Sequence, residues 1–227
     1  MSFHRRIPPR ARRLVRPILL AGLRRTTPLS DRWGYDRGQP IDRYYIERFL
    51  DEYRGDIRGH VLEVKDDAYT RQFGDAIRAD VLDIDPGNAR VTIVADLAAA
   101  NAIEENRFTC FVLTQTLQYV YNLRAAVEHA HRILQPGGVL LVTLPGVSRV
   151  TCESDAVHGD YWRFTRDSAA LLFREVFGDD VTIRTYGNVF AAIAFLTGMA
   201  REELTEKELD VHDERFPVIV AVRARKR

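Results

Sequence analysis

Two carboxylates twenty positions apart carry the clearest chemical signal in this sequence. Glu63 lies near the end of the short apolar run at residues 61–64, and Asp83 lies within the next apolar run, residues 79–85. In nucleotide-binding α/β domains, an acid at the tip of the second parallel strand accepts hydrogen bonds from ribose hydroxyls. The spacing therefore predicts that Asp83 binds a ribose.

The turn that follows the first apolar run lacks the glycines of a phosphate loop. No glycine occurs between Val64 and Gly74. A pyrophosphate needs a G-x-G-x-x-G turn, because only glycine lets the backbone approach the phosphates closely. The absent loop argues against a nicotinamide or flavin dinucleotide. His129 and His131 are two positions apart on a predicted helix and point in different directions, so we predict no metal site.

Alternating apolar runs and amphipathic segments must position these residues. Helical spacing at residues 41–53, with Asp42 as a cap, predicts a helix over the sheet. The predicted strands are residues 61–64, 79–85, 90–96, 108–114, 139–144, 181–186 and 216–223; the other predicted helices are residues 123–134, 168–177 with Asp167 as a cap, and 189–209. We predict an α/β fold with a Rossmann-like, doubly wound, seven-stranded mixed sheet: five parallel strands, a closing terminal strand pair and helices on both faces.

Charge is distributed unevenly along the 227 residues. Residues 1–30 contain eight arginines and no acid, whereas residues 31–227 carry a net charge of −7. We therefore expect a basic, partly disordered arm at residues 1–30 and a single domain at residues 31–227, without affinity for nucleic acid. The apolar patch at residues 18–23 is too short to span a bilayer. The alternative is that the arm contacts a membrane surface or docks on a partner.

Only two cysteines occur, Cys110 in a predicted strand and Cys152 in a predicted loop. This count indicates no disulfide framework, and a cytoplasmic location fits it best.

A set of segments in a fixed order resembles the class I S-adenosylmethionine-dependent methyltransferases. The resemblance covers roughly residues 40–225, and the segments that carry it are Leu62-Glu63-Val64, Asp83, Ala95-Asp96-Leu97, Thr114-Gln115-Thr116-Leu117-Gln118-Tyr119-Val120 and Arg132-Ile133-Leu134-Gln135-Pro136-Gly137-Gly138. It implies an enzyme that uses S-adenosyl-L-methionine, with a cofactor half at about 41–145 and acceptor-side elements at about 146–215.

The resemblance also implies roles for individual residues. Those expected to bind the cofactor are Glu63, Val64, Lys65, Asp83, Asp85, Asp96, Leu97, Thr114 and Gln115. Asp83 would accept both ribose hydroxyls, and Asp85 replaces it if the strand ends two residues later. Asp96 would accept the adenine amino group while Leu97 packs on the ring. The alternatives to these ligand roles are structural: Asp83 would be a turn residue at the strand end, and Asp96 would cap a helix.

Two positions depart from the family pattern. Lys65 stands where a glycine is usual, and a positive φ there would cost on the order of 1 kcal/mol while its side chain crowds the cofactor. The side chain could instead point outward or pair with the carboxylate of the cofactor. Thr109 replaces a usual aspartate at the start of the fourth strand, which affects packing more than chemistry.

Methyl transfer to a hydroxyl needs a base, and the loop after the fifth strand supplies two candidates. His158 is the first, because imidazole titrates near neutrality, and Asp160 is the second. Tyr119, Tyr161 and Trp162 are candidates for binding the acceptor, the last two by stacking on a sugar ring. For each of these residues, a purely structural role is the competing interpretation.

A closer similarity is to methyltransferase-domain proteins that accompany glycosyltransferases in polysaccharide-modifying systems. Three segments carry it: residues 36–47, residues 160–165 and Gly187-Asn188-Val189. It implies O-methylation of a sugar or glycan precursor. The rival hypothesis is a non-catalytic, methyltransferase-like module that binds a glycosyltransferase or scaffold partner.

Overall fold

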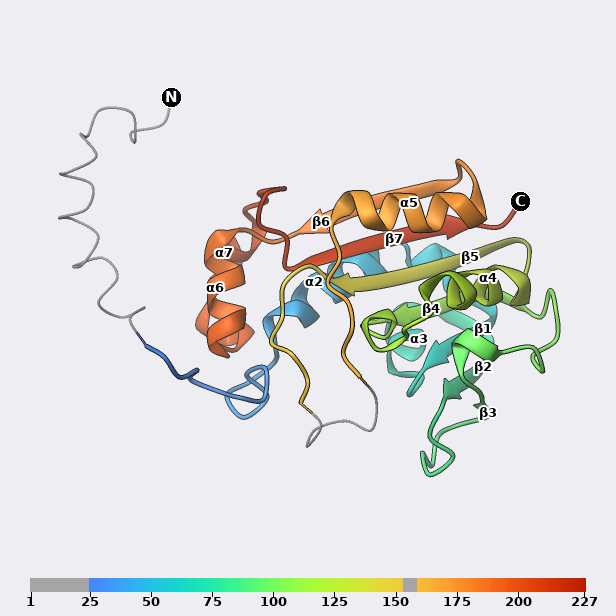
Figure 1. Cartoon of the computed structure of the whole chain (residues 1–227), viewed down its shortest axis with the longest axis horizontal. Helices are drawn as coiled ribbons and strands as arrows, with labels where there is room; N and C mark the ends of the chain where they lie inside the picture. Colours follow the sequence, from blue (N-terminus) through green and yellow to red (C-terminus); the bar gives the residue numbers. More distant parts are fainter. Residues whose placement is uncertain (1–24, 153–158) are drawn as a thin grey trace.

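A seven-stranded sheet forms the centre of the molecule. The computed structural model describes residues 25–152 and 159–227. The strands are β1 (Arg58–Val64), β2 (Asp75–Asp83), β3 (Ile93–Val94), β4 (Phe108–Thr114), β5 (Leu134–Pro145), β6 (Val181–Tyr186) and β7 (Ile219–Arg225). Their spatial order is β3-β2-β1-β4-β5-β7-β6 (Figure 1). This arrangement confirms the predicted Rossmann-like mixed sheet.

Only β7 runs against the other strands. β1 pairs in parallel with β2 and β4, β4 with β5, and β2 with β3. β7 lies between β5 and β6 and is antiparallel to both. The carboxyl ends of the parallel strands therefore share one edge, at which ligands of such sheets bind.

Helices cover both faces of the sheet (Figure 1). The helices are α2 (Ile41–Glu52), α3 (Ala68–Phe73), α4 (Leu123–Ile133), α5 (Arg166–Phe177), α6 (Val189–Thr197) and α7 (Glu206–Asp210), with short 3-10 turns η3 (Arg54–Asp56), η4 (Leu97–Ala99), η5 (Leu117–Tyr119) and η6 (Arg201–Glu203).

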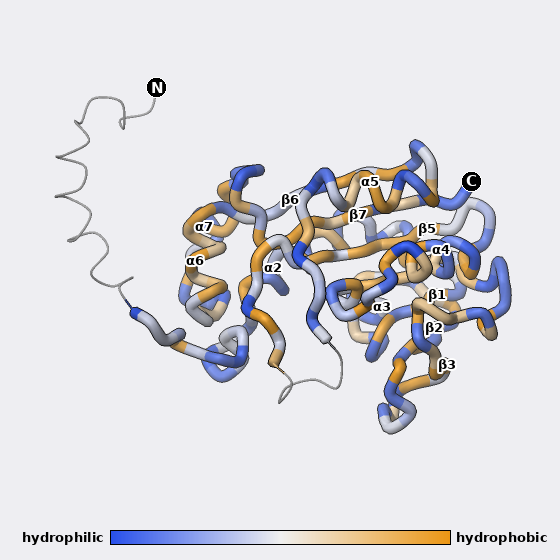
Figure 2. The backbone as a smooth tube through the Cα atoms, in the orientation of Figure 1, coloured by the Kyte–Doolittle hydropathy of each residue, from blue (hydrophilic) through white to orange (hydrophobic). Residues whose placement is uncertain are grey.

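Each face of the sheet has its own apolar core. The neighbours Val61 and Leu62 belong to different cores, because successive strand residues point to opposite faces. Val61 packs in the core that holds α2, α6 and α7, and Leu62 in the core that holds α4 and α5. In Figure 2 the central strands are accordingly hydrophobic along most of their length.

Several predicted boundaries differ from the structure. β1 and β2 begin earlier than predicted, β2 ends at Asp83 rather than at residue 85, β7 lies at Ile219–Arg225 rather than at residues 216–223, and α5 begins at Arg166 rather than at residue 168. β3 is restricted to Ile93–Val94 rather than residues 90–96, because the Oγ1 of Thr92 occupies the Val81 N–H at 2.8 Å. The predicted helix over residues 189–209 is interrupted at Gly198, whose left-handed φ of 77° ends α6. β5 starts earlier than predicted, at Leu134.

Both predicted helix caps were wrong. Pro40 is the N-cap of α2 and makes no side-chain cap, while Asp42 lies in the first turn. Thr165 caps α5 by accepting the Ser168 N–H, and Asp167 also lies in a first turn. Hydroxyl caps with β-region backbone are favoured, so Thr165 competes well with the acid two residues later.

Within residues 25–152 and 159–227, no helix is long and apolar enough to cross a membrane.

Candidate cofactor and acceptor site

The predicted site residues that the structure describes lie at the carboxyl ends of the parallel strands or in the segments next to them. Three segments adjoin this edge: the turn after β1, residues 25–40 before α2, and the connection from β5 to α5 (Figure 1).

Lys65 adopts the backbone conformation that usually requires glycine. Its φ is 72°, and its N–H donates to the Leu82 carbonyl at 3.0 Å. The strand pairing between β1 and β2 is thus continued by one residue before the chain turns. Lys65 is exposed, so its ammonium is free to reorient when a ligand enters.

Glu63 points at the start of α3. Its two carboxylate oxygens accept the N–H groups of Tyr69 (3.1 Å) and Thr70 (2.7 Å), and the residue is only 2% exposed. Burial raises the pKa of Glu63 to about 7, although these hydrogen bonds act in the opposite direction. Glu63 therefore fixes α3 against β1, beside the turn after β1.

Asp83 is buried at the end of β2, and two groups orient its carboxylate. Oδ1 accepts the Asp85 N–H at 3.1 Å, and Oδ2 accepts Nδ2 of Asn88 at 2.7 Å. A carboxylate offers about four lone-pair sites, so about two of them are left for a ligand. Asp85 is exposed and accepts the Gly87 N–H at 2.8 Å, which makes it a turn residue.

Asp96 and Leu97 lie at the end of the short β3. Asp96 is exposed, and its Oδ1 accepts the Ala98 N–H at 2.9 Å, so it caps η4. Its other oxygen accepts no hydrogen bond from the described residues and is available to a ligand. Leu97 is 5% exposed and packs in the core beneath this turn.

Sequence reasoning missed a polar cluster beside the turn after β1. Nη1 of Arg43, in α2, donates to the hydroxyl of Tyr69 in α3 at 2.5 Å. Oδ1 of the neighbouring Asp42 is buried and has no hydrogen-bond partner among the described residues. Burial raises the pKa of Asp42, whereas Arg43 acts to lower it. The local signal in the sequence was a pair of adjacent opposite charges, Asp42 and Arg43, at the start of this helix.

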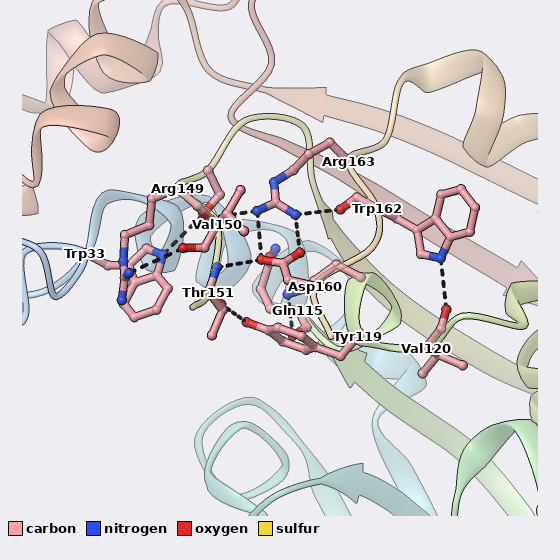
Figure 3. Close-up of polar contacts among 12 residues, drawn as sticks. Trp33, Gln115, Tyr119, Val120, Arg149, Val150, Thr151, Asp160, Trp162 and Arg163 are labelled. Atoms are coloured by element: carbon pink, nitrogen blue, oxygen red, sulfur yellow. Dashed lines mark hydrogen bonds and ion pairs between the residues drawn. The ribbon is translucent and has the colours of Figure 1, made fainter. Parts of the chain in front are cut away.

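Asp160 binds Arg163 through both of its oxygens (Figure 3). The two hydrogen bonds are 2.5 and 2.9 Å long, and Oδ2 also accepts the Thr151 N–H at 2.9 Å. Burial acts to raise the pKa of Asp160, but these hydrogen bonds outweigh it, so the pKa lies below its usual range. The side chain is 2% exposed, and this geometry favours a structural role for Asp160.

The Asp160 pair joins two stretches of the loop after β5. Nη2 of Arg163 also donates to the Arg149 carbonyl at 2.7 Å, and Oγ1 of Thr151 lies 3.1 Å from the Tyr119 hydroxyl (Figure 3). Tyr119 therefore lies beside the loop after β5, and its role in binding the acceptor stays a prediction. Sequence analysis did not identify Arg163 and Thr151, because no local pattern marks loop residues that pair in space.

Trp33 connects the segment before α2 to the same loop. Its ring centroid lies 3.6 Å from Cζ of Arg149, and its Nε1 donates to Oγ of Ser148 at 3.2 Å (Figure 3). A stacked guanidinium and an indole attract through the ring quadrupole. Residues 25–40 therefore border the loop after β5.

Tyr161 and Trp162 contribute to an exposed aromatic group with Tyr121. Tyr121 is 73% and Tyr161 50% exposed, and their rings meet edge to face at 5.3 Å. Trp162 lies 6.1 Å from Tyr121 and donates from Nε1 to the Val120 carbonyl at 3.0 Å. The exposed faces could stack on a flat ligand.

Thr114 and Gln115 end β4, where the chain makes a tight turn. Gln115 has a φ of 45°, and its N–H donates to the Thr143 carbonyl at 2.9 Å. Gln118 donates from Nε2 to the Gln115 carbonyl, while its buried Oε1 has no hydrogen-bond partner in the described structure. A ligand that donates a hydrogen bond would satisfy this oxygen.

Some predictions fall elsewhere. His158 lies outside the described residues. The described residues line one cleft between α2, β6 and α7 and another at the amino end of β1 and β5, and neither contains a predicted site residue. Among these residues, no group of three or more His, Cys, Asp or Glu side chains could hold a metal ion.

Comparison with known families gives one match. Residues 56–142 match a family model described as a methyltransferase domain. A search of curated proteins finds no match.

Three solved structures illustrate the similarity of the fold. A SAM-dependent methyltransferase from Archaeoglobus fulgidus has 12% identity over 81% of this chain and 94% of its own, with a TM-score of 0.52. The Burkholderia thailandensis 1,6-didemethyltoxoflavin-N1-methyltransferase, solved with its acceptor and S-adenosylhomocysteine, has 16% identity over 100% of this chain and 93% of its own, with a TM-score of 0.52. A Haloferax volcanii methyltransferase in complex with the Trm112 activator has 13% identity over 87% of this chain and 98% of its own, with a TM-score of 0.52.

Proposed function

We propose that the protein is a class I, S-adenosylmethionine-dependent methyltransferase that methylates a hydroxyl of a sugar or glycan precursor. The match of residues 56–142 to a methyltransferase-domain model supports the first part of the proposal. The observation that carries the cofactor assignment is the carboxylate of Asp83, buried at the end of β2 and held in place with about two lone-pair sites unused. When bound, S-adenosylmethionine supplies an activated methyl group, so that positioning accounts for most of the catalysis.

The residues around Asp83 fit the nucleoside part of the cofactor. Asp83 is proposed to accept the ribose hydroxyls, because its two oxygens match two neighbouring donors. The unoccupied oxygen of Asp96 is proposed to accept the adenine amino group. We assign the flanks of this site to Val64 at the end of β1 and to Thr114 and Gln115 at the end of β4.

The polar cluster at the start of α2 fits the amino-acid part of the cofactor. A methionine moiety carries one carboxylate and one ammonium, and Arg43 and Asp42 offer the complementary charges. Arg43 donates to a tyrosine hydroxyl rather than to a carboxylate, and Oδ1 of Asp42 is buried without a partner among the described residues. Satisfying such buried groups favours binding. Lys65 can supply a second cation from the turn after β1.

On the acceptor side, the proposed base is His158. Asp160, the other candidate, has both oxygens bound by Arg163 and a lowered pKa, which makes it a poor proton acceptor. Tyr119 is proposed to line the acceptor site, and Tyr161 and Trp162 are proposed to stack on a sugar ring. The sugar assignment itself depends on the similarity of residues 36–47, residues 160–165 and Gly187-Asn188-Val189 to glycosyltransferase-associated proteins.

Calorimetric titration with S-adenosylmethionine tests the cofactor assignment. We expect binding to the wild type and at least tenfold weaker binding to Asp83→Ala. Asp85→Ala is the matched control, because Asp85 is exposed and only shapes a turn. Absence of binding at millimolar ligand to folded wild type would contradict the proposal, and a larger effect of Asp85→Ala would move the ribose site to Asp85.

A second titration separates the two halves of the cofactor. S-adenosylhomocysteine has the amino-acid part, and methylthioadenosine lacks it. We expect Arg43→Gln to weaken binding of S-adenosylhomocysteine at least tenfold and to leave binding of methylthioadenosine unchanged. An equal loss for both ligands would remove Arg43 from the amino-acid subsite.

The second candidate function is a non-catalytic module that binds a glycosyltransferase or scaffold partner. Lys65 at a position that is usually glycine favours it, since its side chain could crowd the cofactor. The Haloferax structure is one case in which a protein of this fold is part of a complex with an activator. Titration distinguishes the two functions, because a non-catalytic module of this kind needs no cofactor.

A further inference from the structure

Three aromatic side chains form an exposed group at the carboxyl edge of the sheet. Tyr121 follows η5, and Tyr161 and Trp162 precede α5. The rings of Tyr121 and Tyr161 meet at an interplanar angle of 71°, and those of Tyr121 and Trp162 at 31°. Because Tyr121 is 73% and Tyr161 50% exposed, much of both rings is open to a ligand. Exposed apolar side chains that gather in one place mark a binding surface, whereas scattered ones do not.

Hydrogen bonds hold this aromatic group in place. The Tyr161 N–H donates to the Gln118 carbonyl at 2.8 Å, and Nε1 of Trp162 donates to the Val120 carbonyl at 3.0 Å (Figure 3). These two bonds join the chain after β4 to the chain before α5. A surface that is already ordered loses little conformational entropy when it binds a ligand. Binding to the aromatic group therefore requires no rearrangement of its backbone.

Gln118 adds a buried polar group next to the aromatic group. The residue is 5% exposed, and its Nε2 donates to the Gln115 carbonyl at 2.8 Å, so its side-chain amide lies at the end of β4. Its Oε1 has no hydrogen-bond partner among the described residues. A buried acceptor without a donor is costly, so a ligand hydroxyl that donates to it would bind favourably. Gln118 thus links a polar contact at the end of β4 to the exposed aromatic group.

The exposure of the aromatic group indicates that it does not hold the sugar unit that reacts. Methyl transfer requires the exclusion of water from the reacting atoms, and a ring stacked on Tyr121 stays in contact with solvent. The reacting unit belongs beside the cofactor, at the strand ends where the Gln118 amide lies. The three residues from Gln118 to Tyr121 span at most about 11 Å, so neighbouring units of one glycan can reach both.

We propose that the aromatic group binds a sugar unit next to the one that is methylated, and that the acceptor is therefore an oligosaccharide or glycan chain rather than a single sugar. The apolar face of the neighbouring unit stacks on Tyr121. Its hydroxyls meet the hydroxyls of Tyr121 and Tyr161, which make no hydrogen bond within the described residues. Gln118 accepts a hydroxyl of the reacting unit. The proposal rests on the sugar assignment of the proposed function and extends it to the length of the acceptor.

Binding to an array of immobilised saccharides tests the proposal. The array carries glucose, galactose, mannose and rhamnose, each as the monosaccharide and as linear tetrasaccharides, and the full-length protein is applied together with S-adenosylhomocysteine. We expect wild type to bind at least one tetrasaccharide roughly tenfold more tightly than its monosaccharide. Tyr121→Ala should reduce this preference to about twofold or less, whereas Tyr121→Phe, which keeps the ring, should retain most of it.

The matched control is Phe190→Ala. Phe190 is an aromatic residue, 44% exposed, on α6, which covers the face of the sheet opposite to the core that Trp162 contacts. This variant should keep the preference of wild type. Circular dichroism establishes that the variants are folded, and Tyr161→Ala replaces Tyr121→Ala if the latter is not.

The outcomes separate this proposal from the sugar assignment. Equal binding of a tetrasaccharide and its monosaccharide by wild type, or an unchanged preference in folded Tyr121→Ala, would overturn the proposal and leave the sugar assignment standing. Absence of binding to every saccharide on the array would overturn both. The titration with S-adenosylmethionine tests the cofactor assignment separately.

Discussion

Asn88 holds Asp83 in position: Nδ2 of Asn88 lies 2.7 Å from Oδ2 of Asp83. The same nitrogen also lies 2.7 Å from the carbonyl oxygen of Lys65. One amide thus ties the proposed ribose acceptor at the end of β2 to the turn after β1. The two parts of the proposed cofactor site are thereby held in register.

This relationship predicts that Asn88 affects cofactor binding through Asp83. Asn88→Ala removes a hydrogen bond to a charged group, for which a loss of about 1.5–3 kcal/mol, or roughly tenfold or more in affinity, is typical. Asn88→Asp should weaken binding further, because two carboxylates would then face each other. Calorimetry with S-adenosylmethionine measures both. In the Asp83→Ala background Asn88→Ala should add little, and a full additive loss would show that Asn88 acts independently of Asp83.

Two variants of Lys65 separate the backbone strain at this position from crowding of the cofactor by the lysine side chain. With a φ of 72°, glycine at this position should be more stable than alanine by about 1 kcal/mol, because alanine keeps the unfavourable Cβ. Urea unfolding of Lys65→Gly and Lys65→Ala measures the difference. Both variants lack the ammonium, so both should bind S-adenosylmethionine more tightly if the lysine crowds the site, and more weakly if it pairs with the ligand. Equal stability of the two variants would contradict the prediction that a Cβ at position 65 strains the backbone.

The sheet could be predicted from the sequence because its signals are local. The alternation of Val61 and Leu62 between two cores, the apolar run of β4 and the Pro136-Gly137-Gly138 turn each lie within a few residues. Asp83 and Asp96 could be placed at strand ends for the same reason. Their positions at the carboxyl edge agree with the sequence analysis, while their ligand roles remain predictions.

The remaining contacts of the site join distant parts of the chain. Arg43 meets Tyr69 across 26 positions, and Trp33 meets Ser148 across 115 positions. Such pairs depend on how helices and loops pack on the folded sheet. The periodicity of a single sequence does not indicate this packing. The shortness of β3 is another such case, because a side chain, that of Thr92, takes the place of a backbone acceptor.

The pKa of Glu63 predicts how stability depends on pH. Burial raises the pKa to about 7, above the ordinary value of 4.5, so the folded protein holds the proton more tightly than the unfolded chain. The stabilisation from this proton is fully present below pH 4.5 and is lost as pH rises through 7, by at most about 3 kcal/mol. Urea unfolding at pH 5 and pH 8 measures the loss. The side chain of Glu63→Gln cannot titrate, so the stability of this variant should fall less than that of wild type between pH 5 and pH 8. An equal fall in both proteins would contradict a raised pKa of Glu63.

The bidentate pair of Asp160 and Arg163 predicts a large structural cost of breaking it. Arg163→Met leaves the Asp160 carboxylate, only 2% exposed, without its cation, and we expect a destabilisation of about 3 kcal/mol, because an unpaired buried charge is costly. Asp160→Asn in the Arg163→Met background should recover part of this loss, since no charge is then buried. Urea unfolding measures both variants.

The same pair separates a structural from a catalytic role of Asp160. If Asp160 holds the loop, Asp160→Asn loses stability, and the folded fraction keeps its affinity for S-adenosylmethionine and most of its turnover. If Asp160 is instead the base, Asp160→Asn is as stable as wild type and inactive, because an amide cannot accept the proton. Its low pKa and the three hydrogen bonds that its oxygens accept lead us to expect the first result. Turnover measured per folded protein is the deciding quantity.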